Sequence, residues 1–183
     1  IKLFEKDLRK VVQAMNEVQA EGINLHPLEE QRDIAKKYRR IGIGVMGFAD
    51  ALIKLGIRYS SEDALELAHK IGITMINTSL SESARMAKIY SKFDGYDYKK
   101  VSSTTWYKRV VKPETDKEIK EYGLYNSALL SIAPTGSISS MIGVSGGVEP
   151  IFDLSYTRKT ESLNGHDEYY KIYTPIVEQY MKE

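Results

Sequence analysis

The stretch over residues 126–152, NSALLSIAPTGSISSMIGVSGGVEPIF, constrains the fold of this chain more than any other part of its sequence. The apolar run at residues 129–133 is of the kind that forms a buried parallel strand. The chain then turns through residues 134–137, and a helical pattern resumes near Ser139. Such a turn brings free backbone N–H groups and nearby hydroxyls to one point, which suits a phosphate. With helices expected before it, this order of elements predicts the α/β class.

Length and composition exclude several classes of function. The chain has 183 residues, 42% hydrophobic and 28% charged, which suits a single domain over residues 1–183 with a core of ordinary size. Its 26 basic and 25 acidic residues leave a formal charge of +1, so no long-range field attracts a nucleic acid or an anionic membrane. No apolar run approaches the roughly 18 residues of a membrane helix. We therefore expect a cytoplasmic protein with neither a nucleic-acid polymer nor a membrane as partner.

The chain contains no cysteine. Disulfides, thiolate metal sites and thiol catalysis within these residues are therefore excluded. We assign no residue to catalysis and none to metal binding. The chain also begins without a methionine and without room for a cap before its first helix, so we expect it to be a piece of a longer protein.

Helical periodicity is clear in two places. Apolar residues at three-and-four spacing predict a helix over residues 1–18, which Gly22 ends. The capping signature at residues 60–63, in which Ser60 and Asp63 would satisfy early helical donors, predicts the start of a long helix. Small residues on one face of that helix, Gly72 and Ser83 among them, would let a neighbouring backbone come close.

Other segments give weaker signals. Residues 96–115 show no clear period and are interpreted as an insertion-like loop, in which Trp106 either packs the loop onto the body or stacks on a base. A short charged helix is expected at residues 114–121, with Gly123 stopping it. Residues 166–168 are interpreted as a polar turn that follows Asn164-Gly165.

A formal G-x-G-x-x-G match is formed by Gly42, Gly44 and Gly47. Dinucleotide binding would require a buried strand before these glycines and an acidic residue at a strand end about twenty positions on. Residues 36–40 are mostly charged, and the acidic pair at residues 62–63 lies at an expected helix start. We favour a short strand at residues 41–45 that passes into a helix near residues 48–55, with the glycines permitting close packing. A dinucleotide-binding domain through Gly42 to Gly47 stays open as an alternative.

Several motifs, in order, resemble the large catalytic (alpha) subunit of ribonucleotide reductase. They are RRIGIGVMGFAD at residues 39–50, APTGSIS at residues 133–139 and SGGVEPIF at residues 145–152. The resemblance covers nearly the whole chain and is greatest to the adenosylcobalamin-dependent (class II) branch. Class I large subunits, which take their radical from a separate metal-containing small subunit, are the alternative. The resemblance implies a helix-rich piece of the catalytic domain, from the second half of its ten-stranded α/β barrel.

The resemblance also implies a binding site. In that family the loop that matches residues 134–138 binds the phosphates of the ribonucleotide substrate. The residues carried over are Pro134, Thr135, Gly136, Ser137 and Ile138, with Ser139 as support at the helix N-terminus. A threonine or serine that merely caps a helix would use the same geometry, so this alternative stays open. Glu149 is expected to anchor backbone donors in the turn rather than to act as a base.

The implied activity of the parent is radical reduction of ribonucleotides to deoxyribonucleotides for DNA replication. Its cysteines carry that chemistry, so we expect this piece alone to be inactive. The implied partners are the ribonucleotide substrate, the rest of the catalytic subunit and further copies in a homo-oligomer. Part of a barrel leaves strand edges open, which predicts association or marginal stability. A helical packing or interaction module that binds no ligand stays open as a function of another class.

Overall fold

The computed structural model describes residues 1–161 and 167–182. The chain divides into two compact units. The first comprises residues 1–43 and 65–131, and the second comprises the remainder. The expectation of one domain over the whole chain stays a prediction.

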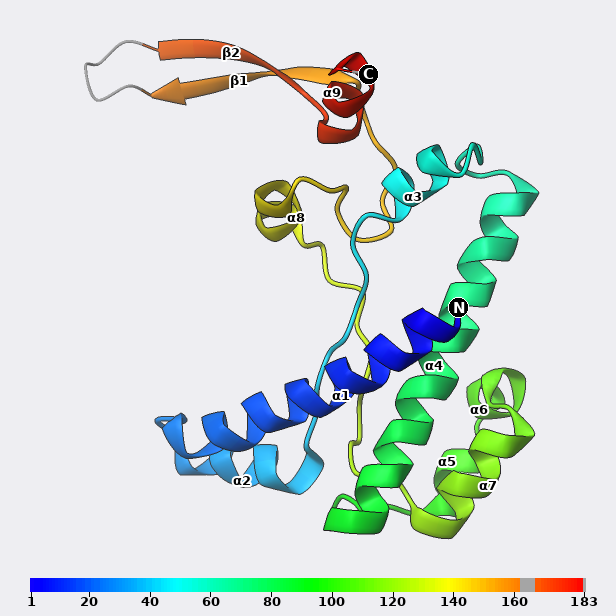
Figure 1. The fold of residues 1–183 in the computed structure, drawn as a ribbon. Helices are drawn as coiled ribbons and strands as arrows, with labels where there is room; N and C mark the ends of the chain where they lie inside the picture. The colour runs from blue at the N-terminus through cyan, green and yellow to red at the C-terminus, as the bar shows by residue number, and fades with distance from the viewer. Residues whose placement is uncertain (162–166, 183) are drawn as a thin grey trace. The chain divides into compact units, whose positions relative to one another are not determined.

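Helices build most of the first unit (Figure 1). They are α1 (Lys2–Gly22), the short 3₁₀ helix η1 (Ile23–Leu25), α2 (Glu29–Tyr38), all but the first three residues of α4 (Glu62–Tyr90), α5 (Tyr98–Ser102), α6 (Thr105–Val110) and α7 (Pro113–Tyr122). The predicted first helix is confirmed, and it ends at Gly22 as expected. The long helix is confirmed as well, since α4 begins at Glu62.

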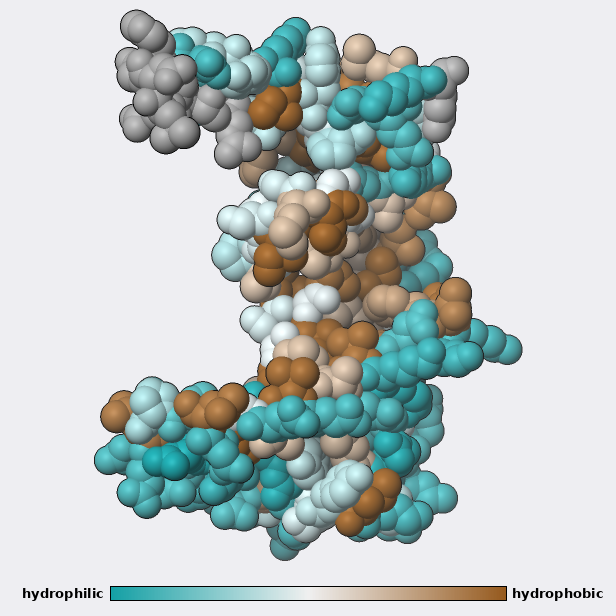
Figure 2. Space-filling view, turned by 60° about the vertical axis from the view of Figure 1, so that its left-hand side comes forward, coloured by the Kyte–Doolittle hydropathy of each residue, from teal (hydrophilic) through white to brown (hydrophobic). Residues whose placement is uncertain are grey.

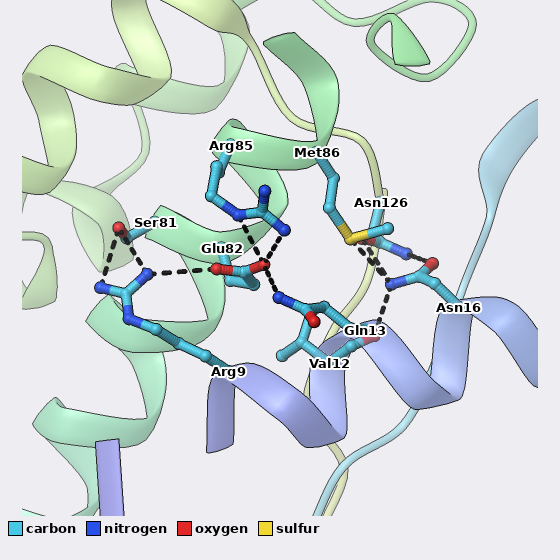
Figure 3. Close-up of polar contacts among 9 residues, drawn as sticks. All are labelled: Arg9, Val12, Gln13, Asn16, Ser81, Glu82, Arg85, Met86 and Asn126. Carbon is cyan, nitrogen blue, oxygen red and sulfur yellow. Dashed lines mark hydrogen bonds and ion pairs between the residues drawn. The ribbon is translucent and has the colours of Figure 1, made fainter. Parts of the chain in front are cut away.

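Helix α1 lies across α4, and the contact combines apolar and polar groups (Figures 1 and 3). Leu8 and Val12 on α1 are buried, and burial of such a side chain stabilises a fold by about 1.5–3 kcal/mol. One turn further on, the buried Asn16 side chain donates to the Asn126 side chain at 3.4 Å and accepts from it at 2.6 Å. This exchange fixes the chain before residue 127 against the helix pair.

The same chain segment packs against the small-residue face of α4. The backbone N–H of Asn126 donates to the Ser83 hydroxyl at 3.0 Å, and that of Tyr125 donates to the Ser83 carbonyl at 3.2 Å. The close backbone approach is therefore confirmed at Ser83. It is wrong at Gly72, where an added Cβ would meet no described atom within 4 Å.

Two extended segments of the first unit run parallel to each other. Ile43 forms an isolated parallel bridge with Leu130, and Ile43 N donates to Leu129 O at 2.9 Å. Ile41 N donates to Ala128 O at 3.0 Å, so two donors that are two residues apart meet acceptors that are one residue apart. This mismatch interrupts a regular ladder. The predicted strands at residues 41–45 and 129–133 are therefore realised only as this short pairing.

Residues 96–115 are not a loop, and that prediction is wrong. They form α5, α6 and the beginning of α7, and each helix has a local start signal. The Asp97 side chain accepts two backbone N–H bonds in α5, the Thr104 hydroxyl accepts one in α6, and Pro113 is the first residue of α7. Helices of five or six residues are too short to show a hydrophobic period, which is why the sequence pattern missed them.

The charged helix predicted at residues 114–121 is confirmed as α7. It ends before Gly123, whose φ of 78° lies in the left-handed region that glycine adopts without strain. Two tyrosine hydroxyls join the preceding short helices to it: Tyr107 donates to Asp116 at 2.7 Å, and Tyr98 donates to the same oxygen at 2.8 Å.

The second unit contains α3 (Phe48–Lys54), α8 (Gly136–Ile142), β1 (Ser155–Glu161), β2 (Asp167–Tyr173) and α9 (Pro175–Lys182). The predicted helix near residues 48–55 is confirmed as α3. Strands β1 and β2 form an antiparallel pair that runs from Ser155 opposite Tyr173 to Glu161 opposite Asp167. The polar turn was therefore wrong for residues 167 and 168, which belong to β2, and residues 162–166 lie outside the described part of the chain.

The cap of α4 differs from the one predicted. Ser60 has a φ of 66°, in the left-handed region, and the Ser61 hydroxyl accepts the backbone N–H of Ala64 at 3.2 Å. The capping residue type was therefore correct and its position was wrong by one residue.

Candidate functional site

The predicted phosphate loop lies in the second unit, where extended chain enters α8. The helix begins at Gly136, so the predicted start near Ser139 is wrong. Ser139 lies inside the first turn, where its backbone N–H donates to Thr135 O at 2.9 Å and its hydroxyl donates to Gly136 O at 3.3 Å. It supports the turn from within instead of standing at the helix N-terminus.

Three successive backbone N–H groups open this helix: those of Gly136, Ser137 and Ile138. Among the hydrogen bonds of the described residues, none of the three has an acceptor. A helix start leaves such groups unsatisfied unless a side chain, water or a ligand accepts from them. All three residues are exposed.

Thr135 does not cap the helix. It has φ 33° and ψ 19°, a left-handed conformation that is uncommon for a β-branched residue, and its hydroxyl makes no capping bond to α8. The hydroxyl instead accepts the backbone N–H of Gly147 at 2.9 Å. The capping alternative therefore does not describe Thr135, which joins the loop to the chain that follows the helix.

The structure requires glycine at position 147 but not at position 136. Gly147 has a φ of 44°, and a Cβ there would lie 3.3 Å from Ala133 O, so backbone conformation and packing both require it. Gly136 has no positive φ, and a Cβ there would meet no described atom within 4 Å. Neither of these structural reasons accounts for a glycine at position 136.

A cleft of about 630 Å³ adjoins the loop within the second unit. Pro134, Gly136 and Ser139 contribute to its wall. The acidic residues that line it are Glu149, Asp153 and Glu178. No lysine or arginine of the described residues lines it. A phosphate in this cleft would therefore meet backbone N–H groups and carboxylates, without a cation from this chain.

Glu149 does not hold backbone donors of the turn, and that prediction is wrong for the described residues. Its own backbone N–H donates to Gly146 O at 3.0 Å. The carboxylate that does hold the turn is Asp50 on α3, whose Oδ2 accepts the backbone N–H of Ser145 at 2.7 Å. Sequence reasoning missed Asp50, although an acidic residue in the first turn of a helix that follows a glycine-rich segment was a usable signal.

The glycines of the motif that suggested a dinucleotide site have other roles. Gly42 lies inside the parallel pairing of the first unit and does not follow a strand, and a Cβ there would lie 3.1 Å from the Cβ of Ser131. Gly47, in the second unit, precedes α3 with a φ of 76°. The fingerprint of a dinucleotide site requires a strand that ends before its first glycine. Close packing, as favoured from the sequence, accounts for Gly42.

A second cavity, of about 270 Å³, lies in the first unit. Its walls come from α4, from α5 and α6, and from the chain at residues 126–130. Trp106 lines this cavity and is 52% exposed, so it packs only partly onto the rest of the unit. Its stacking on a base stays a prediction. Within residues 1–161 and 167–182, no three His, Asp or Glu side chains gather closely enough to hold a metal ion. No helix in the same ranges is long and apolar enough to cross a bilayer.

Comparison with known proteins gives consistent matches. The family model for the ribonucleotide reductase barrel domain matches residues 2–182. The vitamin B12-dependent ribonucleoside-diphosphate reductase of Thermoplasma acidophilum is 35% identical over 144 residues, which cover 79% of this chain and 16% of that protein. The protein of the same name from Mycobacterium tuberculosis is 31% identical over 137 residues, covering 74% and 17%. The ribonucleoside-diphosphate reductase large subunit of monkeypox virus is 31% identical over 175 residues, covering 88% and 21%.

The chain thus spans about a sixth to a fifth of the length of these relatives. The family model, in contrast, extends over almost every residue of the chain, including both paired segments, the loop and the β1–β2 hairpin. On this match the chain belongs to the ribonucleotide reductase large-subunit family, within its barrel domain.

Proposed function

We propose that this chain is part of the catalytic subunit of a ribonucleoside-diphosphate reductase, and that residues 134–138 bind the phosphate groups of its ribonucleotide substrate. The observation that carries the proposal is Gly136. Its conformation and its open surroundings give the protein no reason of its own for a glycine. Gly136 is the first residue of α8, and glycine is a poorer helix former than alanine. A phosphate that approaches the backbone at this point accounts for the residue.

The groups beside Gly136 supply the hydrogen bonds that a phosphate needs. Its N–H and those of Ser137 and Ile138 are adjacent and have no acceptor among the described residues. The Thr135 hydroxyl accepts from Gly147, which leaves its own proton free to donate to a phosphate oxygen. Three or four such bonds hold a phosphate, and bonds to a charged acceptor are the stronger kind.

Neutralising charge comes from another part of the enzyme in this proposal. The cleft beside the loop is lined by three carboxylates, and no described cation lines it. A diphosphate bound here would be repelled unless positive charge were added. We therefore assign the cation to the rest of the catalytic subunit, and we expect this chain alone to bind nucleotides weakly.

Exposed apolar side chains support a larger assembly. Figure 2 shows apolar residues (brown) that interrupt the polar surface. Around the loop and just after it, the exposed ones are Ile132, Ile138, Met141, Ile142, Phe152 and Leu154. A contiguous exposed apolar patch marks an interaction site. We infer that the remaining strands of a ten-stranded α/β barrel cover it, with this chain in the second half of the barrel, and that the enzyme is a homo-oligomer.

The chemistry of the reaction belongs to the parent. This chain has no cysteine, so it contributes substrate binding and no thiol. Because relatives from two organisms are named vitamin B12-dependent, we propose adenosylcobalamin as the cofactor, which supplies the initiating radical when bound. A separate metal-containing subunit is the alternative source. The cleft beside the loop is lined by three carboxylates and shows no feature specific for a corrin, so we assign the cofactor site to the rest of the catalytic subunit.

The test is Gly136→Ala in the full-length catalytic subunit. The methyl group would meet no described atom within 4 Å, so the free energy of unfolding should stay the same or rise by up to about 1 kcal/mol. The KM for the ribonucleoside diphosphate should rise by about tenfold or more, because the methyl group blocks the approach of the phosphate. Gly72→Ala is the matched control, since it also adds a methyl to an open helical glycine. It should leave the KM unchanged.

Two results would contradict the proposal. An unchanged KM in the Gly136→Ala enzyme would contradict phosphate binding by this loop and would favour a packing module without a ligand. Reduction of ribonucleotides above background by the purified 183-residue chain would contradict the assignment of all thiol chemistry to the rest of the enzyme.

A further inference from the structure

We propose that Asp50 is a positioning residue for the phosphate loop and acts through Ser145; this inference rests on the function proposed for the loop. Asp50 lies in the first turn of α3 and is only 8% exposed. Its Oδ2 accepts the backbone N–H of Ser145 at 2.7 Å. The two residues are 95 positions apart in the sequence, and both lie in the second unit.

The backbone N–H, the carbonyl and the hydroxyl of Ser145 all form hydrogen bonds. Besides the bond to Asp50, its carbonyl accepts the backbone N–H of Gly47 at 2.8 Å. Its hydroxyl accepts the backbone N–H of Asp50 at 3.4 Å, a longer and weaker bond. The start of α3 thus fixes both the position and the orientation of Ser145.

The neighbours of Ser145 hold the loop at both of its ends. On one side, the backbone N–H of Val144 donates to Ser139 O at 3.0 Å, inside α8. On the other side, the backbone N–H of Gly147 donates to the Thr135 hydroxyl at 2.9 Å, at the entrance to the loop. A shift of Ser145 would therefore move the two bonds that frame the N–H groups of residues 136–138.

The burial of Asp50 argues against a role limited to its own helix. An acidic residue in the first turn stabilises a helix without being buried, as the exposed Asp63 does in the first turn of α4. Asp50 is buried although its Oδ1 has no partner among the described residues, which is an unfavourable arrangement. The charge-assisted hydrogen bond from Ser145 N–H offsets this cost and accounts for the burial of the carboxylate.

The experiment compares three variants of the full-length catalytic subunit: Asp50→Ala, Asp50→Asn and the control Asp63→Ala. Asp50→Ala should raise the KM for the ribonucleoside diphosphate by about tenfold, with kcat changed by less than about threefold, because the loop loses binding geometry and no reacting group. Asp50→Asn keeps an oxygen that can accept from Ser145, so it should restore the KM to within about threefold of the unchanged enzyme. Asp63→Ala should leave both constants unchanged.

Hydrogen exchange on the same proteins gives a readout that is independent of turnover. Exchange at the backbone N–H groups of Val144, Ser145 and Gly147 should become faster in Asp50→Ala and stay slow in Asp50→Asn. A KM that is unchanged in Asp50→Ala while Gly136→Ala raises it would overturn the role of Asp50 and leave the phosphate loop intact. An unchanged KM in both variants would overturn the loop as well. Equal losses in Asp50→Asn and Asp50→Ala would also overturn the proposal, since the accepting oxygen would then not be what matters.

Discussion

Glu82 shows how one buried carboxylate joins two helices. It is 1% exposed on α4, and it accepts from Arg9 at 3.3 Å, Gln13 at 2.7 Å and Arg85 at 2.6 Å (Figure 3). Arg9 and Gln13 belong to α1, so the carboxylate ties the two helices together. A buried charge is tolerated when it is paired and its lone pairs are filled, and the three donors meet that condition.

We expect Glu82→Gln to lower the free energy of unfolding by about 2 kcal/mol at pH 7. Glutamine keeps the shape of the side chain, but it removes the charge and turns an amide N–H₂ toward a guanidinium. The loss stays moderate because Arg9 and Arg85 are 42% and 48% exposed and regain water. Urea unfolding of the original protein and of Glu82→Gln measures this difference in the free energy of unfolding. The control is Glu66→Gln on the same helix, whose ion pair with Lys70 is exposed and should contribute nothing measurable.

The same residue predicts a pH dependence. Burial acts to raise the pKa of Glu82, but the hydrogen bonds from Arg85, Gln13 and Arg9 and the charge of Arg85 outweigh it, so the pKa lies below its usual 4.5. A depressed pKa in the folded state gives stability that is present above pH 4.5 and is lost as the pH falls through the folded value. The difference between the original protein and Glu82→Gln should therefore shrink below pH 4.5. A constant difference down to about pH 3 would contradict this account.

At the scale of elements, the pairing of residues 41–43 with residues 128–131 depends on a glycine. The Cβ of Ser131 lies only 3.1 Å from the place where a Cβ of Gly42 would be, whereas facing Cβ atoms of paired strands are normally about 4.5–5.5 Å apart. The two segments are therefore closer at this point than two side chains allow. The bonds of Ile43 to residues 129 and 131 keep them there.

Gly42→Ala should consequently destabilise the chain by about 1 kcal/mol, because Ser131 is held by its backbone and cannot yield without weakening the pairing. Gly72→Ala should have the opposite sign and stabilise by up to about 1 kcal/mol, since alanine is the better helix former and meets no described atom within 4 Å. Thermal unfolding of Gly42→Ala and of Gly72→Ala tests these two expected changes in stability. Changes in melting temperature of the same sign in both variants would show that packing at Gly42 does not determine the effect.

On the scale of the whole molecule, many apolar side chains of the described residues are exposed. Helix α1 exposes Leu3 at 70% and Val18 at 68%, and Phe152 after the loop is 85% exposed. The β1–β2 hairpin is a sheet of two strands, which is marginally stable by itself in water. Within the described residues, the paired segments of the first unit likewise form no sheet beyond their single bridge.

We expect the isolated chain to self-associate or to unfold at low denaturant concentration. Apolar surface and strand edges without partners favour both outcomes. Light scattering across a concentration series, together with urea unfolding, measures them. A monodisperse monomer with high resistance to urea would contradict the inference that the rest of a barrel covers these surfaces.

Local signals in the sequence predicted several elements correctly. The periodicity of α1 and the start of α4 identified the two long helices, and Gly22 and Gly123 marked two helix ends. At Gly123 the reason is its φ of 78°, which glycine adopts without strain. The motif at residues 133–139 indicated the family and the place of the loop, because its residue types and their order are specific. Strands β1 and β2 were missed because residues 166–168 were interpreted as a polar turn and no strand was predicted beside them.

Local composition and motif order were enough to predict the family, the main helices and the position of the proposed phosphate loop, because each depends on residues that are close together in the chain. The folded structure was needed to show that Asp50 and not Glu149 holds the turn after α8, and that Glu82 is buried between α1 and α4. Asp50 bonds a residue 95 positions away, and Glu82 bonds one 69 positions away. Such contacts depend on how the chain folds back on itself, so they leave no period or motif from which they could be predicted.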